Sequence, residues 1–301
     1  LEAYEGMLVT FPQPLTISEY FNFDRFGEIV LKTDRQSTPT AVVEPGTDAV
    51  ALAATQALAR ITLDDGRTTQ NSDPAIHPNG AIFNLSNSFR GGDIVQNVTG
   101  VVDYSFGLYR IQPTRGADYT PANPRTAAPD AVGGSMKVAS FNVLNYFTTL
   151  APIGRGADTL EEFARQRAKI FAALAAIDAD VVGLIEIENN TAAIQDLVDG
   201  LNTVVGAGTY AYVDTGIIGT DAIKVAFIYK PATVQPVGAY AVLDSSVDAR
   251  YIDTKNRPAL AQTFAHTADN AAVTVVVNHL KSKGADCNDV GDLDLGDGAG
   301  N

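Results

Sequence analysis

Alternation of apolar and polar residues marks the first third of the chain. Short runs rich in β-branched residues predict β-strands at 7–11, 15–17, 27–31 and 93–102, followed by a turn and a further strand over 104–113. An alanine-rich stretch at 48–59 predicts one short helix among them. Several short strands with a single helix are typical of a small β-barrel or sandwich, so we expect an OB-like barrel over residues 1–113.

A change of composition follows this region. Residues 114–135 are rich in proline, glycine and other small residues. Such a stretch is part extended and part flexible, which is typical of the segment between two domains. We therefore predict a linker over 114–135 and a second domain over 136–301.

The second region has a different periodicity. Apolar residues at helical spacing predict a helix over 159–177, and a second helix is expected at 191–201. Buried-type strands are predicted at 137–143, 180–186, 224–229 and 273–279. Strands and helices that alternate in this way are typical of a layered α/β sandwich, so the whole chain belongs to the α+β class.

Composition narrows the possible functions. The chain has 301 residues, a formal net charge of −14 and one cysteine, Cys287, and it contains no apolar run of the length that a membrane span needs. A single cysteine excludes a zinc finger or a disulfide-dense scaffold. The acidity argues against a broad basic surface for nucleic acid. It is equally expected of a protein that is merely highly soluble and of a hydrolase that binds divalent cations through carboxylates.

Polar side chains end three of the predicted strands. Asn142, Glu186 and His279 each follow a buried-type run, and in layered α/β enzymes such strand ends gather at one edge of a sheet. Carboxylate and amide oxygens are ligands for Mg²⁺, Mn²⁺ or Ca²⁺, and a histidine beside them can bond a phosphate oxygen. Taken singly, each residue also has a plain structural explanation: a turn former, a solvated strand end and a core histidine.

Four motifs together resemble the endonuclease/exonuclease/phosphatase superfamily, and most closely its secreted bacterial extracellular nucleases, in which an OB-like domain precedes the catalytic domain. The motifs are SFNVLN at 140–145, DVVGLIEIEN at 180–189, NRP at 256–258 and NHLKSKG at 278–284. The resemblance implies a four-layer sandwich of the deoxyribonuclease I type.

The resemblance also implies roles for individual residues. Glu186 corresponds to the metal-binding glutamate, with Asn142 helping to place metal and phosphate, and His279 corresponds to the histidine at the scissile phosphate. Asp221 is the candidate that orients His279. The implied substrate-binding residues are Asn145, Arg257, Asn278, Lys281 and Lys283.

The expected activity is therefore hydrolysis of extracellular nucleic acid, with DNA rather than RNA as the expected substrate. The enzyme is expected to be secreted and monomeric and to use Mg²⁺, with Ca²⁺ or Mn²⁺ as the alternative metals. The superfamily's later Gly-Asp-x-Asn and Asp-His motifs have no match in the chain. We therefore expect a chain truncated at both ends that holds only the first half of the sandwich and is inactive by itself. The resemblance also implies a disulfide partner for Cys287 beyond Asn301.

Two alternatives remain open from the residues. The first keeps the chemistry and changes the substrate to a phosphomonoester or a phospholipid headgroup. The second is a non-catalytic protein that binds nucleic acid or mediates adhesion through its N-terminal barrel. The joint presence of Asn142, Glu186 and His279 argues against the second.

Overall fold

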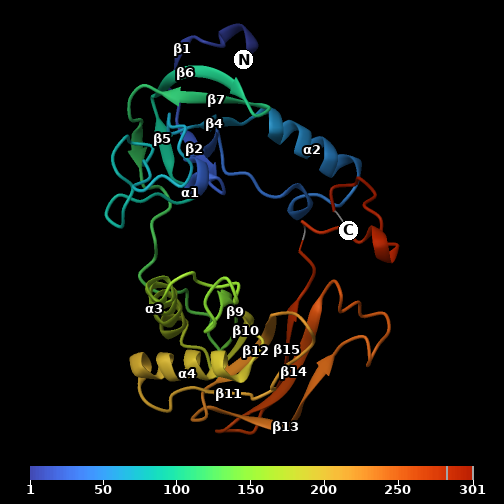
Figure 1. Cartoon of the computed structure of the whole chain (residues 1–301). Coiled ribbons are helices and arrows are strands. Elements are labelled where there is room, and N and C mark those ends of the chain that lie inside the picture. The colour runs from blue at the N-terminus through green and yellow to red at the C-terminus, as the bar shows by residue number, and fades with distance from the viewer. Residues whose placement is uncertain (283, 300–301) are drawn as a thin grey trace. The chain divides into compact units, whose positions relative to one another are not determined.

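The chain forms two compact units in a computed structural model that describes residues 1–282 and 284–299 (Figure 1). The first unit comprises 1–126 together with the segment from Asp286 onward, and the second comprises 127–285. Both units mix helices and strands, so the protein is of the α+β class as the sequence predicts. Across the described residues, no helix combines the length and the apolar character that a membrane span requires.

The first unit is built around one eight-stranded sheet with the order β1-β6-β7-β4-β3-β2-β5-β8. Its strands are β1 (Leu8–Phe11), β2 (Leu15–Glu19), β3 (Ile29–Lys32), β4 (Ile61–Leu63), β5 (Ile94–Gln96), β6 (Val98–Ser105), β7 (Leu108–Pro113) and β8 (Asp118–Thr120). Its helices are α1 (Phe23–Phe26), α2 (Thr47–Leu58) and the 3-10 turns η1 (Glu2–Tyr4), η2 (Pro39–Ala41) and η3 (Asn288–Val290).

The pairing in this sheet returns to its starting point. Only Asn97, with a φ of 55°, separates β5 from β6, so 94–105 is one bent segment. From β6 the pairing runs through β7, β4, β3 and β2, and β2 then pairs with β5. The bend at Asn97 therefore lets one continuous segment, 94–105, bond both end strands of the four-strand series β7-β4-β3-β2. Inward-facing side chains such as Ile17, Leu31 and Ile111, all fully buried, fill the space between these strands.

The segment after Asp286 packs on α2 and the loop before it. Gly46 N donates a hydrogen bond of 2.8 Å to Asp297 O. Gly298 approaches α2 so closely that a Cβ there would lie 3.4 Å from the Ala49 side chain. The last described residues thus belong to the same unit as the first.

The second unit contains two sheets and two helices. The strands are β9 (Val138–Tyr146), β10 (Val181–Glu188), β11 (Ala211–Tyr212), β12 (Ile223–Tyr229), β13 (Val234–Leu243), β14 (Arg257–His266) and β15 (Ala272–His279), and the helices are α3 (Leu160–Ile177) and α4 (Thr191–Val205). One sheet has the order β11-β12-β10-β9 and the other β13-β14-β15. Strand β10 is parallel to β9 and antiparallel to β12.

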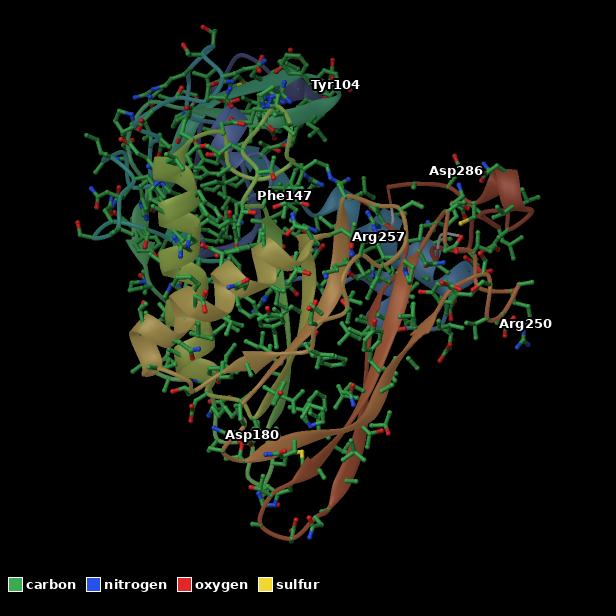
Figure 2. The ribbon with its side chains drawn as sticks, turned by 60° about the horizontal axis from the view of Figure 1, so that its bottom comes forward. Tyr104, Phe147, Asp180, Arg250, Arg257 and Asp286 are labelled. Carbon is green, nitrogen blue, oxygen red and sulfur yellow. The ribbon has the colours of Figure 1, made fainter. Side chains whose placement is uncertain are left out.

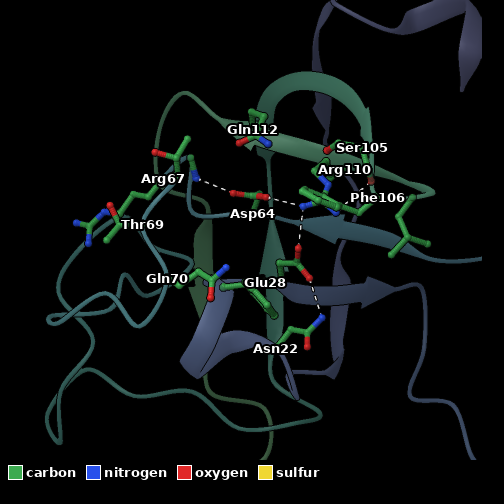
Figure 3. Close-up of a pocket in the computed structure, with 14 residues that line it drawn as sticks. Asn22, Glu28, Asp64, Arg67, Thr69, Gln70, Ser105, Phe106, Arg110 and Gln112 are labelled. Atoms are coloured by element: carbon green, nitrogen blue, oxygen red, sulfur yellow. Dashed lines mark hydrogen bonds and ion pairs between the residues drawn. The ribbon is translucent and has the colours of Figure 1, made fainter.

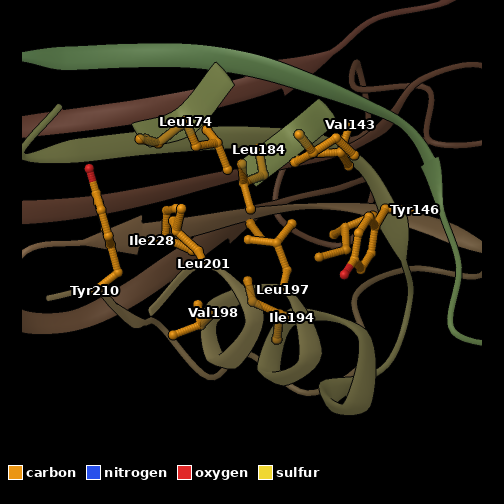
Figure 4. Packing of buried hydrophobic residues seen from close by; sticks show 14 of the residues in the cluster. Val143, Tyr146, Leu174, Leu184, Ile194, Leu197, Val198, Leu201, Tyr210 and Ile228 are labelled. Atoms are coloured by element: carbon orange, nitrogen blue, oxygen red, sulfur yellow. The ribbon is translucent and has the colours of Figure 1, made fainter. Parts of the chain in front are cut away.

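These elements form three layers, with helices on one face of the four-stranded sheet and the second sheet on the other. Alternate residues of β12 show this directly, because Ala226 and Ile228 pack in the helix-side core while Val225 and Phe227 pack against the second sheet. Figure 4 shows the helix-side core, where Leu174 of α3 and Leu197 of α4 meet Leu184 of β10. Helix α3 begins with a side-chain cap, since Thr159 Oγ1 accepts a hydrogen bond from Glu162 N.

The two sheets approach each other most closely at Gly183 in β10. A Cβ at this position would lie 2.5 Å from Val277 Cγ2 of β15. The glycine therefore allows β15 to lie directly over β10, which brings the end of β15 near the end of β10.

Several sequence expectations differ from this arrangement. Strand β8 lies inside the predicted linker 114–135 and pairs with β5, so the first unit extends to Thr126. The segment from Asp286 packs with the first unit although it was assigned to the second domain. The predicted strand 93–102 is divided at Asn97. Strands β4, β11, β13 and β14 have no counterpart among the predicted elements.

Candidate metal and phosphate site

The candidate site begins at a β-bulge in β10. Ile185 pairs with Val225 and Ile187 with Lys224 on one side, which leaves Glu186 as an extra residue between them. On the other side Ile185 pairs with Asn142 and Ile187 with Tyr146. Glu186 has a φ of 68°, a left-handed conformation that costs about 1–2 kcal/mol for a residue with a Cβ. The bulge turns its carboxylate to the end of the sheet.

The facing end of β9 is shaped to hold this carboxylate. Asn142 Nδ2 donates to Glu186 Oε1 at 2.8 Å, and Asn145 N donates to Glu186 Oε2 at 3.2 Å. Leu144 and Asn145 both have positive φ, 52° and 50°. The Asn142 oxygen accepts the Leu144 N–H at 2.7 Å, which fixes the amide with its nitrogen toward Glu186. In this conformation the amide nitrogen of Asn142 positions Glu186, while the oxygen accepts one hydrogen bond from the backbone.

His279 approaches the same carboxylate from the second sheet. Its Nε2 lies 3.6 Å from Glu186 Oε1, and each of the two side chains exposes 19% of its surface. Nδ1 is buried without a hydrogen-bond partner among the described residues. Burial lowers the pKa of His279, and the charge of Arg257 lowers it further against the opposing effect of Glu186 and Asp221. These effects favour the neutral form of the imidazole.

Arg257 pairs directly with His279 across β14 and β15. Its Nε donates to Asp221 Oδ2 at 3.0 Å. Figure 2 shows Arg257 at the same end of the second unit as Phe147, which follows β9, while Asp180 lies at the opposite end. The ends of β9 and β10 and the paired positions of β14 and β15 thus supply one site.

Asp221 has partners other than the one predicted from sequence. Its carboxylate pairs with Arg257 and with Arg155, and it accepts a hydrogen bond from Ile223 N. Among the described residues no hydrogen bond or ion pair joins Asp221 to His279, and the charge of Asp221 acts on His279 only at a distance. Burial acts to raise the pKa of Asp221, but the Ile223 bond and the two arginines outweigh it and hold this pKa below its usual range.

Glu188 and Asn189, at the end of β10, hold the loops next to the site. Glu188 Oε2 accepts from Thr148 N and Thr148 Oγ1, both at 2.8 Å, and from Thr149 N at 3.2 Å. Asn189 Nδ2 donates to Ile218 O and Asp221 O, at 2.7 and 2.9 Å. These contacts tie the loops on either side of β10 to its end.

A groove of about 660 Å³ opens beside Asn142 and Asn145. Arg155, Arg165 and Lys169 line it together with Gln166. Sequence reasoning did not single out these cations. Arg155 lies between two glycines in a loop, and the other two lie on the polar face of a helix, where such residues are ordinarily only solvated.

Of the remaining predicted substrate-binding residues, Asn278 and Lys281 do not join the cluster around Glu186. Lys281 Nζ donates back to Ser282 O at 3.1 Å and Ala285 O at 2.5 Å, and Lys281 N donates to Asn256 Oδ1 at 2.9 Å. Asn278 is exposed and lies on the opposite face of β15 from His279, because neighbouring strand residues alternate. Lys283 lies outside the described residues.

The chemistry of these donors fits a hard cation only in part. Glu186 uses one bond per oxygen, so each oxygen retains a lone pair for a metal. Among the described residues, no three His, Cys, Asp or Glu side chains form a cluster able to hold a metal ion. A cation at Glu186 would therefore complete its shell with water and substrate oxygens, as Mg²⁺ commonly does.

One comparison with known proteins matches only the N-terminal part of the chain and ends near the boundary between the two units. Residues 1–125 match a family described as a domain of unknown function (DUF8508). No curated protein matches the chain in sequence. The match covers the N-terminal part of the first unit, through β8, and leaves out the segment from Asp286.

Solved structures resemble part of the chain distantly. They include humanized D. rerio TDP2 (16% identity, TM-score 0.34, covering 50% of this chain and 49% of that one) and the human Nocturnin catalytic domain with bound sulfate (18%, 0.33, 49% and 51%). A third is an endonuclease/exonuclease/phosphatase family protein from Bacteroides thetaiotaomicron (16%, 0.36, 50% and 53%). The chain thus spans about half the length of these structures. Likenesses this distant do not establish an activity.

Proposed function

We propose that the protein hydrolyses phosphodiester bonds of nucleic acid, with DNA preferred to RNA as the substrate and a divalent metal held at Glu186. The observation that carries this proposal is the bulge of β10. It places one carboxylate, in a strained conformation, between an asparagine on β9 and a histidine on β15. Strain of this kind concentrates at functional positions.

Each side chain then has a defined task. Asn142 and the backbone of Asn145 hold the Glu186 carboxylate, while His279 donates to a phosphate oxygen. A proton on His279 Nδ1 would be buried without an acceptor, so the tautomer with Nε2–H is favoured and directs its donor to the site. A bound Mg²⁺ or Mn²⁺ would polarise the phosphate and stabilise the leaving oxygen.

The cations around the site would bind the rest of the substrate. Asp221 fixes the Arg257 guanidinium through Nε, so its terminal nitrogens are those that a phosphate would meet. Arg155, Arg165 and Lys169 in the neighbouring groove would contact phosphates further along the strand. Of these cations, Arg155 and Arg257 share Asp221, and Arg165 lies 3.9 Å from Glu162.

The proposal extends to the first unit and to the location of the protein. Its pairing through 94–105, with β4 parallel to β7, supports an OB-like barrel. The extracellular location and monomeric state follow from the sequence resemblance and form part of the same proposal, as does the deoxyribonuclease-like sandwich for the second unit.

Metal binding tests the proposal directly. Titration of the protein with Mn²⁺, followed by water proton relaxation, should reveal a site that Glu186→Gln removes. Glu161→Gln is the matched control, because Glu161 is an exposed carboxylate on α3 in the same unit. A short oligothymidylate should tighten Mn²⁺ binding by supplying phosphate oxygens. Mn²⁺ binding that survives Glu186→Gln would refute the assignment.

Substrate class requires a second measurement. Hydrolysis of DNA, RNA, a phosphomonoester and a phospholipid headgroup should be compared with Mg²⁺ and with EDTA, for wild type and Glu186→Gln. Metal-dependent cleavage of nucleic acid alone supports the proposal. Cleavage of the monoester or headgroup alone contradicts the nucleic-acid assignment while leaving the metal site in place.

A further inference from the structure

A strained aromatic residue forms the tip of the β6–β7 hairpin. Ser105 pairs with Leu108, so the loop consists of Phe106 and Gly107 alone. Their φ values are 52° and 77°. A two-residue loop with positive φ at both positions is a type I′ turn, for which Asn-Gly is strongly preferred.

The turn itself does not require a phenylalanine there. The left-handed conformation is a clear outlier for a bulky side chain. Burial does not compensate, since Phe106 is 91% exposed. An exposed ring held in an unfavourable conformation indicates a role in contact with another molecule.

This ring stands at the edge of a pocket of about 760 Å³ in the first unit (Figure 3). Phe26, Phe106 and Leu108 provide its apolar lining. The Arg110 guanidinium lies 5.4 Å from the centre of the Phe106 ring, so the ring is close to the polar floor.

The floor is a fixed network. Arg110, with 4% of its side chain exposed, donates from Nη1 to Glu28 Oε1 at 2.7 Å and to Asp64 Oδ2 at 2.9 Å. Its Nη2 donates to Ser105 O at 3.2 Å, while its Nε is buried without a partner among the described residues. Asn22 Nδ2 donates to the other oxygen of Glu28 at 2.9 Å. A floor held in this way is preorganised for a ligand.

The charges of the pocket decide the class of ligand. Two carboxylates, Glu28 and Asp64, balance two guanidinium groups, Arg67 and Arg110. A polyanion would need an excess of cations, which the pocket lacks. The other polar lining is neutral and rich in amides and hydroxyls, including Thr69, Gln70 and Gln112. Hydroxyl groups of a sugar would pair with such a lining, and its apolar ring face would stack on an aromatic side chain.

We propose that this pocket binds a neutral saccharide, with Phe106 as the stacking platform and the Arg110 network as the hydrogen-bonding floor. The site is independent of Glu186 and of the proposed hydrolysis. It would hold the protein on a carbohydrate surface while the second unit acts.

Calorimetric titration with maltohexaose, cellohexaose and chitohexaose, alongside a short oligothymidylate, tests this proposal. We expect at least one saccharide to bind, and Phe106→Asn to weaken that binding by roughly tenfold or more. Phe106→Asn should also raise the denaturant midpoint, because asparagine suits a type I′ turn. Loss of binding therefore cannot be attributed to unfolding.

Two controls complete the design. Tyr104→Ala removes an exposed aromatic on the same hairpin. Tyr104 packs against Tyr109 and does not line the pocket, so its loss should leave binding unchanged. Glu186→Gln should also leave saccharide binding unchanged, which separates this proposal from the hydrolytic one. Absence of binding by all three saccharides, binding unaffected by Phe106→Asn, or binding of the oligothymidylate alone would each overturn it.

Discussion

Three residues of the candidate site adopt the left-handed backbone conformation. Leu144, Asn145 and Glu186 all adopt positive φ, and all lie where β9 and β10 end. An ordinary strand would send the Glu186 side chain to a face of the sheet. The local cost in backbone energy is thus tied to the direction of one carboxylate.

Substituting Glu186 separates this strain from the chemistry. Glu186→Gly removes the Cβ from a left-handed residue, whereas Glu186→Ala keeps it. We expect the glycine variant to be more stable than the alanine variant by about 1 kcal/mol in urea unfolding, with Mn²⁺ binding lost in both. Equal stabilities would show that the bulge relaxes when the carboxylate is removed.

Asp221 makes the stability of the second unit depend on acid pH. Its pKa is lowered in the folded state, so its contribution is complete above the ordinary aspartate pKa of about 3.9 and is lost as pH falls toward the folded value. We expect wild type to exceed Asp221→Asn in stability by about 0.5–1 kcal/mol at pH 6 and by less at pH 3. Urea unfolding at both values measures the difference. A gap that is the same at the two pH values would mean that the ion pairs with Arg155 and Arg257 contribute nothing.

Sequence reasoning singled out some residues of the candidate site and not others, for physical reasons. Glu186 and His279 end buried strands, and two such ends converge wherever the sheets stack. Side-chain partners across loops leave no such pattern. The pairing of Asp221 with Arg155 depends on how a glycine-flanked loop folds back, and the fixed amide of Asn142 depends on the turn at Leu144.

At the level of elements, strand β10 connects the two sheets of the second unit. It bonds β9 and β12 within its own sheet, and at Gly183 it contacts β15 of the other. The distance between Glu186 and His279 depends on this contact.

We expect Gly183→Ala to destabilise the protein by about 1–3 kcal/mol, because the new methyl would lie 2.5 Å from Val277 Cγ2. Val277→Ala removes the obstructing methyl groups, so the double variant should lose less than the sum of the two single losses. Urea unfolding of all four proteins gives the coupling. Strict additivity would contradict the close approach of the sheets.

Elements with long regular patterns were predictable, and irregular strands were not. The apolar stripe and Thr159 cap of α3 lie in the sequence itself. Strand β13 contains Pro236 and Gly238, which ordinarily argue against a strand. It tolerates them because it lies at the edge of its sheet and carries a register shift between Val237 and Ala241. Strand β4 has three residues, too few for any periodicity.

At the scale of the whole molecule, the division into a strand-rich unit and a layered unit was predictable from the change in periodicity. Its boundaries were not. Strand β8 lies among prolines and glycines and is a strand only because β5 offers it an edge. The return of the segment after Asp286 to the first unit rests on contacts with α2 and its preceding loop, which no local pattern announces.

Hydrogen exchange can test whether the segment after Asp286 packs on the first unit. In the full chain the Gly46 amide should exchange slowly, because it donates to Asp297 O. A chain ending at Ala285 should lose this protection, while amides in β10 and β12 keep theirs. Fast exchange at Gly46 in both chains would show that the contact does not persist in solution.

The bond between Gly46 and Asp297 also has a consequence for synthesis. A chain emerging from the ribosome exposes Gly46 and α2 long before Asp297 is made, and all of the second unit is produced in the interval. The first unit therefore acquires its strands early but receives the segment 286–299 only after the second unit has been made. Slowing translation through residues 286–299 would prolong the time for which this part of α2 stays uncovered.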